Sequence, residues 1–150
     1  MQKQTINFNS AEKVFILAQN VSGATLSQYA AVFMDATSAI NGEIGVSGAV
    51  TGKKHLFVGS LQQSLASNAK GFVQTYGPSS IYLVLSDTGA SAVPGDQLIA
   101  VTSQTYLVDF SGTSGVPTAG ENYVTLLDYY SAAAGGNSAP LAKAAFIRAM

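Results

Sequence analysis

The chain has 150 residues, of which 47% are hydrophobic and only 10% charged, and its formal net charge is −1. Globular proteins carry about 25% charged residues, so neutral side chains must form most of this surface. Seven scattered Lys and Arg residues exclude a nucleic-acid partner, because phosphate binding needs clustered positive charge. The absence of cysteine excludes disulfides and thiolate metal sites, and no apolar run reaches the roughly 18 residues of a membrane-spanning helix.

Short apolar runs bounded by turn residues recur along the chain, which is typical of strands. Residues 61–69 fit either a short helix or an irregular crossover, and residues 138–150 favour a final strand over a helix. In chain order, we predict strands at 13–19, 27–35, 55–59, 71–76, 81–86, 97–101, 105–110, 123–128 and 144–150.

The segments between these runs have turn or loop composition. Gly77-Pro78-Ser79-Ser80 predicts a tight reversal between two strands. Ile81–Leu85 carries bulk on both faces, which predicts a central strand covered on both sides. The Gly/Ala/Ser-rich segments 41–52 and 131–137 predict surface loops.

We therefore predict an all-β protein, either an antiparallel β-sandwich or a small β-barrel with Gly/Ser/Ala-rich loops. Residues 11–150 would form a single β domain, and residues 1–10 an extended N-terminal arm.

One segment suggests catalysis. Leu83–Ala90 is an apolar strand followed by Asp-Thr-Gly-Ala, which resembles the active-site turn of retroviral-type aspartic proteases, where two such aspartates share a proton. However, Ser86 stands where that family places an apolar residue, and the supporting apolar-apolar-Gly segment is absent. Asp and Gly also favour ordinary turns. We interpret Asp87 as a turn residue and keep a protease that uses Asp87 as an alternative.

Other reactive sites lack their residues. His55 is the only histidine, so there is no histidine pair, and no Asp-x-Asp-x-Asp loop is present. The chain also lacks a phosphate-binding loop and a dinucleotide fingerprint. We expect no catalytic residue, no cofactor and no metal.

The sequence offers candidates for protein contacts instead. Tyr129 and Tyr130 stand beside a Gly/Ala-rich segment, and tyrosine is enriched at protein interfaces. Packing of both rings in the core is the equally good alternative. In the arm, Ile6 and Phe8 occupy alternate positions, which suits addition as an edge strand to a neighbour. These four residues are our predicted interface residues.

Several segments resemble small tailed-phage virion proteins. In that group, a Gly-aromatic-Val-Gln-x-Tyr-Gly strand, here within Lys70–Pro78, follows an apolar strand that ends in Gly, here Leu56–Gly59. A second apolar strand (Ile81–Leu85) and a Gly-Asp-x-Leu turn (Pro94–Leu98) come next. Val14–Asn20 looks like the first strand of the family. The chain thus resembles capsid decoration (cement) proteins or related head accessory proteins.

The resemblance implies a β-rich, non-enzymatic structural protein. Such a protein binds the outside of a phage capsid, with the major capsid protein as its partner, and reinforces contacts between capsid subunits. It implies a homotrimer on the virion surface, assembled in the host cytoplasm, with no nucleic-acid or membrane partner. A head-fibre or tail-associated β module is the main alternative.

Overall fold

Strands dominate the described part of the chain, as the apolar runs between Gly- and Ser-rich turns predict. The computed structural model describes residues 12–35, 44–48, 56–85, 91–100, 104–109, 124–131 and 139–149. The strands are β1 (Val14–Asn20), β2 (Ala31–Met34), β3 (Ile44–Ser47), β4 (Phe57–Leu61), β5 (Lys70–Val84), β6 (Ser91–Ala92), β7 (Gln97–Ala100), β8 (Leu107–Asp109), β9 (Val124–Leu126), β10 (Tyr130–Ser131) and β11 (Leu141–Arg148).

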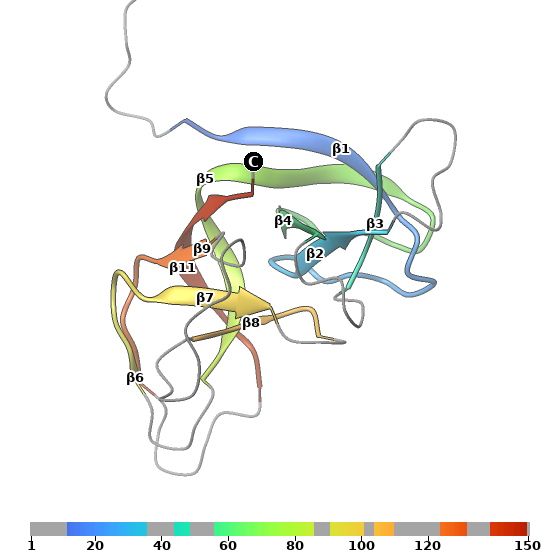
Figure 1. The fold of residues 1–150 in the computed structure, drawn as a ribbon. Coiled ribbons are helices and arrows are strands. Elements are labelled where there is room, and N and C mark those ends of the chain that lie inside the picture. Colours follow the sequence, from blue (N-terminus) through green and yellow to red (C-terminus); the bar gives the residue numbers. More distant parts are fainter. Residues whose placement is uncertain are drawn as a thin grey trace, which may run out of the picture.

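Nine of these strands form one sheet that closes on itself twice (Figure 1). β1, β3, β2 and β4 pair in that order, and the first half of β5 closes the circle by pairing with both β4 and β1. We call this the first barrel. The second half of β5 pairs with β11, followed by β9, β7 and β8, and β8 pairs back to β5. We call this circle the second ring.

The barrel alternative of the fold prediction is therefore confirmed, and a sandwich is not observed. The prediction of an antiparallel sheet is correct for most pairs, but β1 pairs with β3 in parallel, and β5 pairs with β8 in parallel. Sequence periodicity carries no information about strand direction, since side chains alternate in the same way in both arrangements.

The long strand β5 corrects the predicted reversal at Gly77-Pro78-Ser79-Ser80. These residues lie within one strand of 15 residues, which curves from the first barrel into the second ring (Figure 1). Gly77 has a φ of +96°, which glycine adopts without strain. The Gln74 side-chain amide spans this point, donating hydrogen bonds to the carbonyls of Tyr76 (3.1 Å) and Pro78 (2.9 Å). The Gly-Pro pair therefore redirects the strand without ending it.

Each closed circle has its own apolar core. The core of the first barrel consists of Ala18, Leu26, Ala30, Val32, Val46, Val58, Leu61, Leu65 and Val73. The core of the second ring consists of Ala31, Phe33, Phe57, Ile81, Leu83, Leu85, Ala92, Leu98, Leu107, Val124, Leu126, Tyr130, Ala145 and Ile147. Phe33 and Phe57 belong to first-barrel strands, and their rings meet edge to face at 5.7 Å. They join the barrel to the second core.

Two further predictions have clear outcomes. The predicted loop 41–52 contains β3, whose residues Gly45, Val46 and Ser47 are buried, so the loop prediction is wrong there. Gly45 fits because a Cβ at this position would already meet the Asp35 carbonyl oxygen at 3.1 Å. Residues 61–69 form no helix. They leave β4 and cross over through a bridge between Leu65 and Leu26.

The final strand is confirmed as β11, which begins three residues before the predicted start at 144. The Ile81–Leu85 segment is central, as predicted, because β11 and β8 pair with the two edges of β5 there. Its cover is less complete than predicted: Ile81, Leu83 and Leu85 on one face are buried, but Tyr82 and Val84 on the other face are only partly buried.

Candidate interaction surface

Three large apolar side chains project outward from the pair β1–β5. The strand β1 alternates, with Ala18 and Asn20 buried and with Phe15 and Leu17 facing outward at 43% and 53% exposure. Leu17 lies directly opposite Phe72 of β5, which is 56% exposed. Opposed residues on one face of an antiparallel pair are in contact range. Phe15, Leu17 and Phe72 therefore form one surface, which we call the apolar strip.

A groove of about 330 Å³ adjoins the strip, and it is lined by Phe15, Phe72, Gln62 and Gln63. The Gln62 amide is anchored, because it donates a hydrogen bond to the Ser79 hydroxyl at 2.8 Å. The described lining residues give the groove apolar walls with two neutral amides, and none of these residues is charged. Such a surface suits a neutral protein partner better than an ionic ligand.

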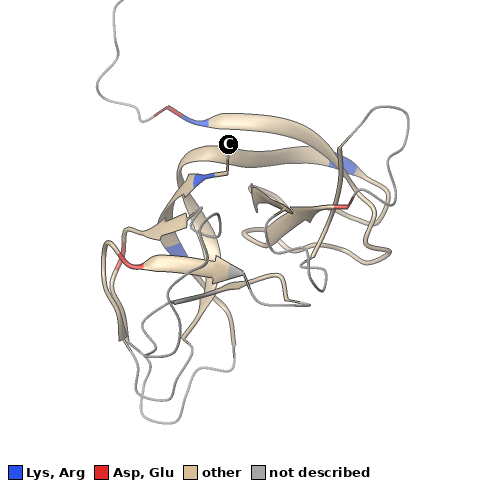
Figure 2. Ribbon diagram, in the orientation of Figure 1, with Lys and Arg blue, Asp and Glu red and all other residues tan. Residues whose placement is uncertain are grey.

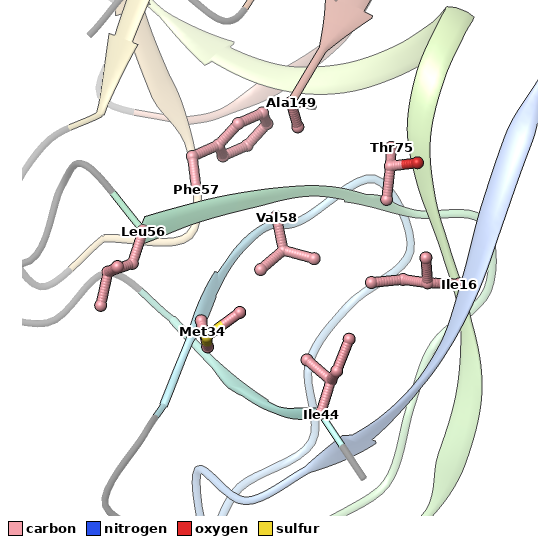
Figure 3. Close-up of a pocket in the computed structure, with 8 residues that line it drawn as sticks. All are labelled: Ile16, Met34, Ile44, Leu56, Phe57, Val58, Thr75 and Ala149. Carbon is pink, nitrogen blue, oxygen red and sulfur yellow. The ribbon is translucent and has the colours of Figure 1, made fainter. Parts of the chain in front are cut away.

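A second hollow of about 300 Å³ opens at one end of the first barrel, and we call it the mouth cavity (Figure 3). Figure 3 shows side chains converging on it, and they come from β1, β2, β3, β4 and β5 and from the C-terminal end of the chain. Thr75 is the only polar side chain among the lining residues that the structure describes, and its hydroxyl already donates to the Val14 carbonyl at 3.3 Å. The lining residues are Ile16, Met34, Ile44, Leu56, Phe57, Val58, Thr75 and Ala149.

Within the part of the chain that the structure describes, the edge of β1 beside this cavity is paired only in part. Over Val14–Leu17, β5 is the only described strand in register with β1, and β3 joins at Ala18. An unpaired strand edge presents backbone donors and acceptors that can receive another strand. The cavity and this edge meet at Ile16, which lines the cavity.

Charged side chains are sparse over the described strands, as the small blue and red segments of Figure 2 show. Lys143 forms an ion pair with Asp128, with the Lys143 nitrogen 3.6 Å from a carboxylate oxygen. Within the described ranges, no three His, Cys, Asp or Glu residues gather in a group that would hold a metal ion. None of the described residues forms a helix with the length and apolar character needed to cross a membrane.

The residues that carry the family resemblance have roles in folding. Gly59 of β4 lies so close to its paired strand β5 that a Cβ there would overlap the Gln74 carbonyl. At Gly71, a Cβ would lie 2.8 Å from a methyl group of Leu65, and at Gly77 it would overlap the Glu12 carbonyl. The glycines of the motif thus allow neighbouring segments to approach the curved strand β5 closely.

The predicted interface residues are only partly within the described residues. Ile6 and Phe8 lie outside them, as do the rest of the arm 1–10, His55 and Asp87. Tyr129 is 56% exposed. Tyr130 instead packs in the second core, beneath the Lys143 nitrogen at 5.0 Å from its ring centre, and burial raises the pKa of its hydroxyl. Of this pair, Tyr129 is exposed and Tyr130 is buried.

Sequence reasoning missed the apolar strip, although β1 held a signal for it. The run Val14-Phe15-Ile16-Leu17 is apolar on both faces, which is typical of a strand covered on both sides. In the structure, only the inner face is covered by the chain's own core. The excess apolar face was the available sign of an interaction surface.

No family model matches the chain, and no curated protein matches it. Among solved structures, the chain is similar to the crystal structure of the head fiber gp8.5 N base in bacteriophage phi29. The alignment covers 92% of this chain and 96% of that one, with 12% sequence identity and a TM-score of 0.48.

Proposed function

We propose that this protein is a structural component of a phage virion that binds the outside of the capsid and reinforces contacts between major capsid subunits. The apolar strip Phe15–Leu17–Phe72 is the observation that carries the proposal. It would be the docking surface, and the resemblance of the β4–β5 segments to decoration proteins supplies the partner.

The physical support lies in the kind of surface the strip offers. Burying a Leu or Phe side chain contributes about 1.5–3 kcal/mol, and a few such residues supply most of the affinity of an interface. Gln62, whose amide is held by its hydrogen bond to Ser79, and the neighbouring Gln63 would supply uncharged hydrogen-bonding groups beside the apolar strip. A shell repeats this contact many times, so modest energy per copy stabilises the whole particle.

The same reading makes the protein a binding protein and not an enzyme. Its described surface places apolar and amide groups where contact is expected, and contact needs no titrating group. Homo-oligomerisation, with a trimer as the expected state, belongs to this proposal because capsid sites are related by symmetry.

The test is co-sedimentation of purified protein with heads that lack it, taken from the phage that encodes it. Leu17→Ser should weaken head binding about tenfold or more, since tenfold corresponds to about 1.4 kcal/mol. Leu127→Ser is the matched control, because Leu127 is also exposed (47%) but lies beyond β9 of the second ring. Both variants should melt like the parent protein.

Equal head binding by the two variants would contradict the assigned docking surface. Failure of the parent protein to bind heads would contradict the function itself. Peptide hydrolysis that is abolished by Asp87→Asn would favour the protease alternative.

A further inference from the structure

We propose that the mouth cavity of the first barrel is a receptor for the N-terminal arm of a second copy of this chain. The Phe8 ring of one copy would fill the cavity of the next, and the arm backbone would pair with β1 along Val14–Leu17. This inference concerns self-association and does not depend on capsid binding.

The cavity has the size and chemistry for an aromatic ring. An apolar protein cavity of about 150 Å³ can bind benzene, and this one measures about 300 Å³. Among the described residues that line it, none is charged, and the Thr75 hydroxyl already has the Val14 carbonyl as its partner. An apolar side chain is therefore the occupant that leaves no polar group without a partner.

The strand edge above the cavity offers the backbone contacts. No described strand pairs with the β3 side of β1 over Val14–Leu17. A peptide strand added at such an edge gains main-chain hydrogen bonds, and its alternate side chains enter pockets below. Ile16 points into the cavity from this part of β1 (Figure 3), so a strand paired here would place alternate side chains over the cavity.

The arm has the matching sequence. Residues 4–10 carry no charge, and Ile6 and Phe8 are two positions apart, so both would face the cavity side of an added strand. Ten extended residues span about 33 Å, which is long enough to reach a neighbouring molecule.

A second copy fits this role better than the same chain. Glu12 and Lys13 lie alongside Gly77 of β5, where a Cβ on Gly77 would meet both of them. A hairpin that leaves Glu12 and Lys13 in place brings Phe8 no further along β1 than Lys13. Ile16 and the cavity are then out of reach of the chain's own Phe8.

Disulfide trapping tests this directly, because the chain contains no cysteine. Ile6→Cys, which keeps the Phe8 ring, would be made in one preparation with an affinity tag, and Met34→Cys, at the cavity, in an untagged preparation. Mixed and mildly oxidised, the pair should form mixed dimers at least tenfold faster than Ile6→Cys mixed with the control Leu127→Cys. A peptide of residues 2–10 should suppress this cross-linking, and the same peptide with Phe8→Ser should not.

Equal trapping at Met34 and Leu127 would overturn the proposal. Efficient cross-linking within a single molecule that carries both Ile6→Cys and Met34→Cys, with none between molecules, would assign the cavity to the chain's own arm. Neither result depends on phage heads, so failure here is distinguishable from failure of the proposed function.

Discussion

The first barrel and the second ring share β5 but fill their interiors differently. Small residues dominate the first-barrel core, whereas the second ring is filled mainly by leucine and isoleucine. All five fully enclosed polar residues of the described chain lie on first-barrel strands: Asn20, Ser47, Ser60, Gln74 and Thr75. The mouth cavity and the apolar strip also belong to the first barrel.

This contrast suggests that the two closed circles contribute differently to stability and to binding. A core of large aliphatic residues yields more transfer free energy per residue than one of alanine and valine. The second ring would then supply most of the stability. The first barrel, which contains polar contacts and close backbone approaches, carries the surfaces that we propose for binding.

The largest expected loss of stability comes from Gly59, where β4 lies close against its paired strand β5. Gly59→Ala should destabilise the fold by roughly 3 kcal/mol, because the new Cβ overlaps the Gln74 carbonyl and rigid backbone must move. Gly23→Ala is the matched control. Gly23 also has a positive φ (+78°), but a Cβ there meets nothing within 4 Å, so it should cost only about 1–2 kcal/mol. Urea unfolding measures the stability of both variants. Equal losses would contradict the importance of the close approach of β4 to β5.

Truncating one core side chain in each closed circle compares how much the two cores contribute to stability. Leu83→Ala in the second ring should cost about 2–5 kcal/mol, and Val73→Ala in the first barrel should cost less because fewer atoms are removed. Since both residues lie on β5, each variant should shift one common unfolding transition. Calorimetry that resolves two separate transitions would show that the halves unfold independently.

Asn20 tests the polar support of the first barrel. Its amide donates to the carbonyls of Ala24 (2.7 Å) and Leu65 (2.8 Å), and its oxygen accepts from the backbone and hydroxyl of Ser22. Asn20→Ala removes these hydrogen bonds at a buried position and should cost about 1–3 kcal/mol. Ser22→Ala, which removes only an exposed partner, should cost less in the same unfolding measurement.

The smallest expected effect is confined to alkaline pH. Burial raises the pKa of Tyr130 above its ordinary value of 10.0, so the folded state holds this proton more tightly than the unfolded state. Stability from the neutral hydroxyl is complete below pH 10 and falls as the pH rises from 10 through the raised pKa. The melting temperature of Tyr130→Phe should fall less between pH 9 and 11 than that of the parent protein. Tyr129→Phe, at an exposed ring, should behave like the parent.

Much of the strand content could be predicted from the sequence, because apolar runs and turn residues are local signals. The continuation of β5 through Gly77-Pro78 could not, since the same dipeptide also favours a reversal. What decides the outcome is β11, which pairs with this stretch from the far end of the chain and places Phe146 opposite Pro78. β3 was missed for a similar reason, because its parallel partner β1 is distant in sequence.

The candidate surfaces were less predictable than the fold. Sequence reasoning selected Tyr129 and Tyr130 as a pair, but only the three-dimensional packing separates the exposed ring from the buried one. The apolar strip depends on the register that sets Leu17 opposite Phe72, and register across non-local strands is not visible in composition.

The 15-residue strand common to both closed circles also has a mechanical consequence. Tension along β5 is resisted by β1 and β4 at one end and by β11 and β8 at the other. Pulling along such a strand loads its lateral hydrogen bonds together, in shear, instead of opening them one by one like a zipper. A force applied to the first barrel would thus be transmitted along β5 to the aliphatic core of the second ring.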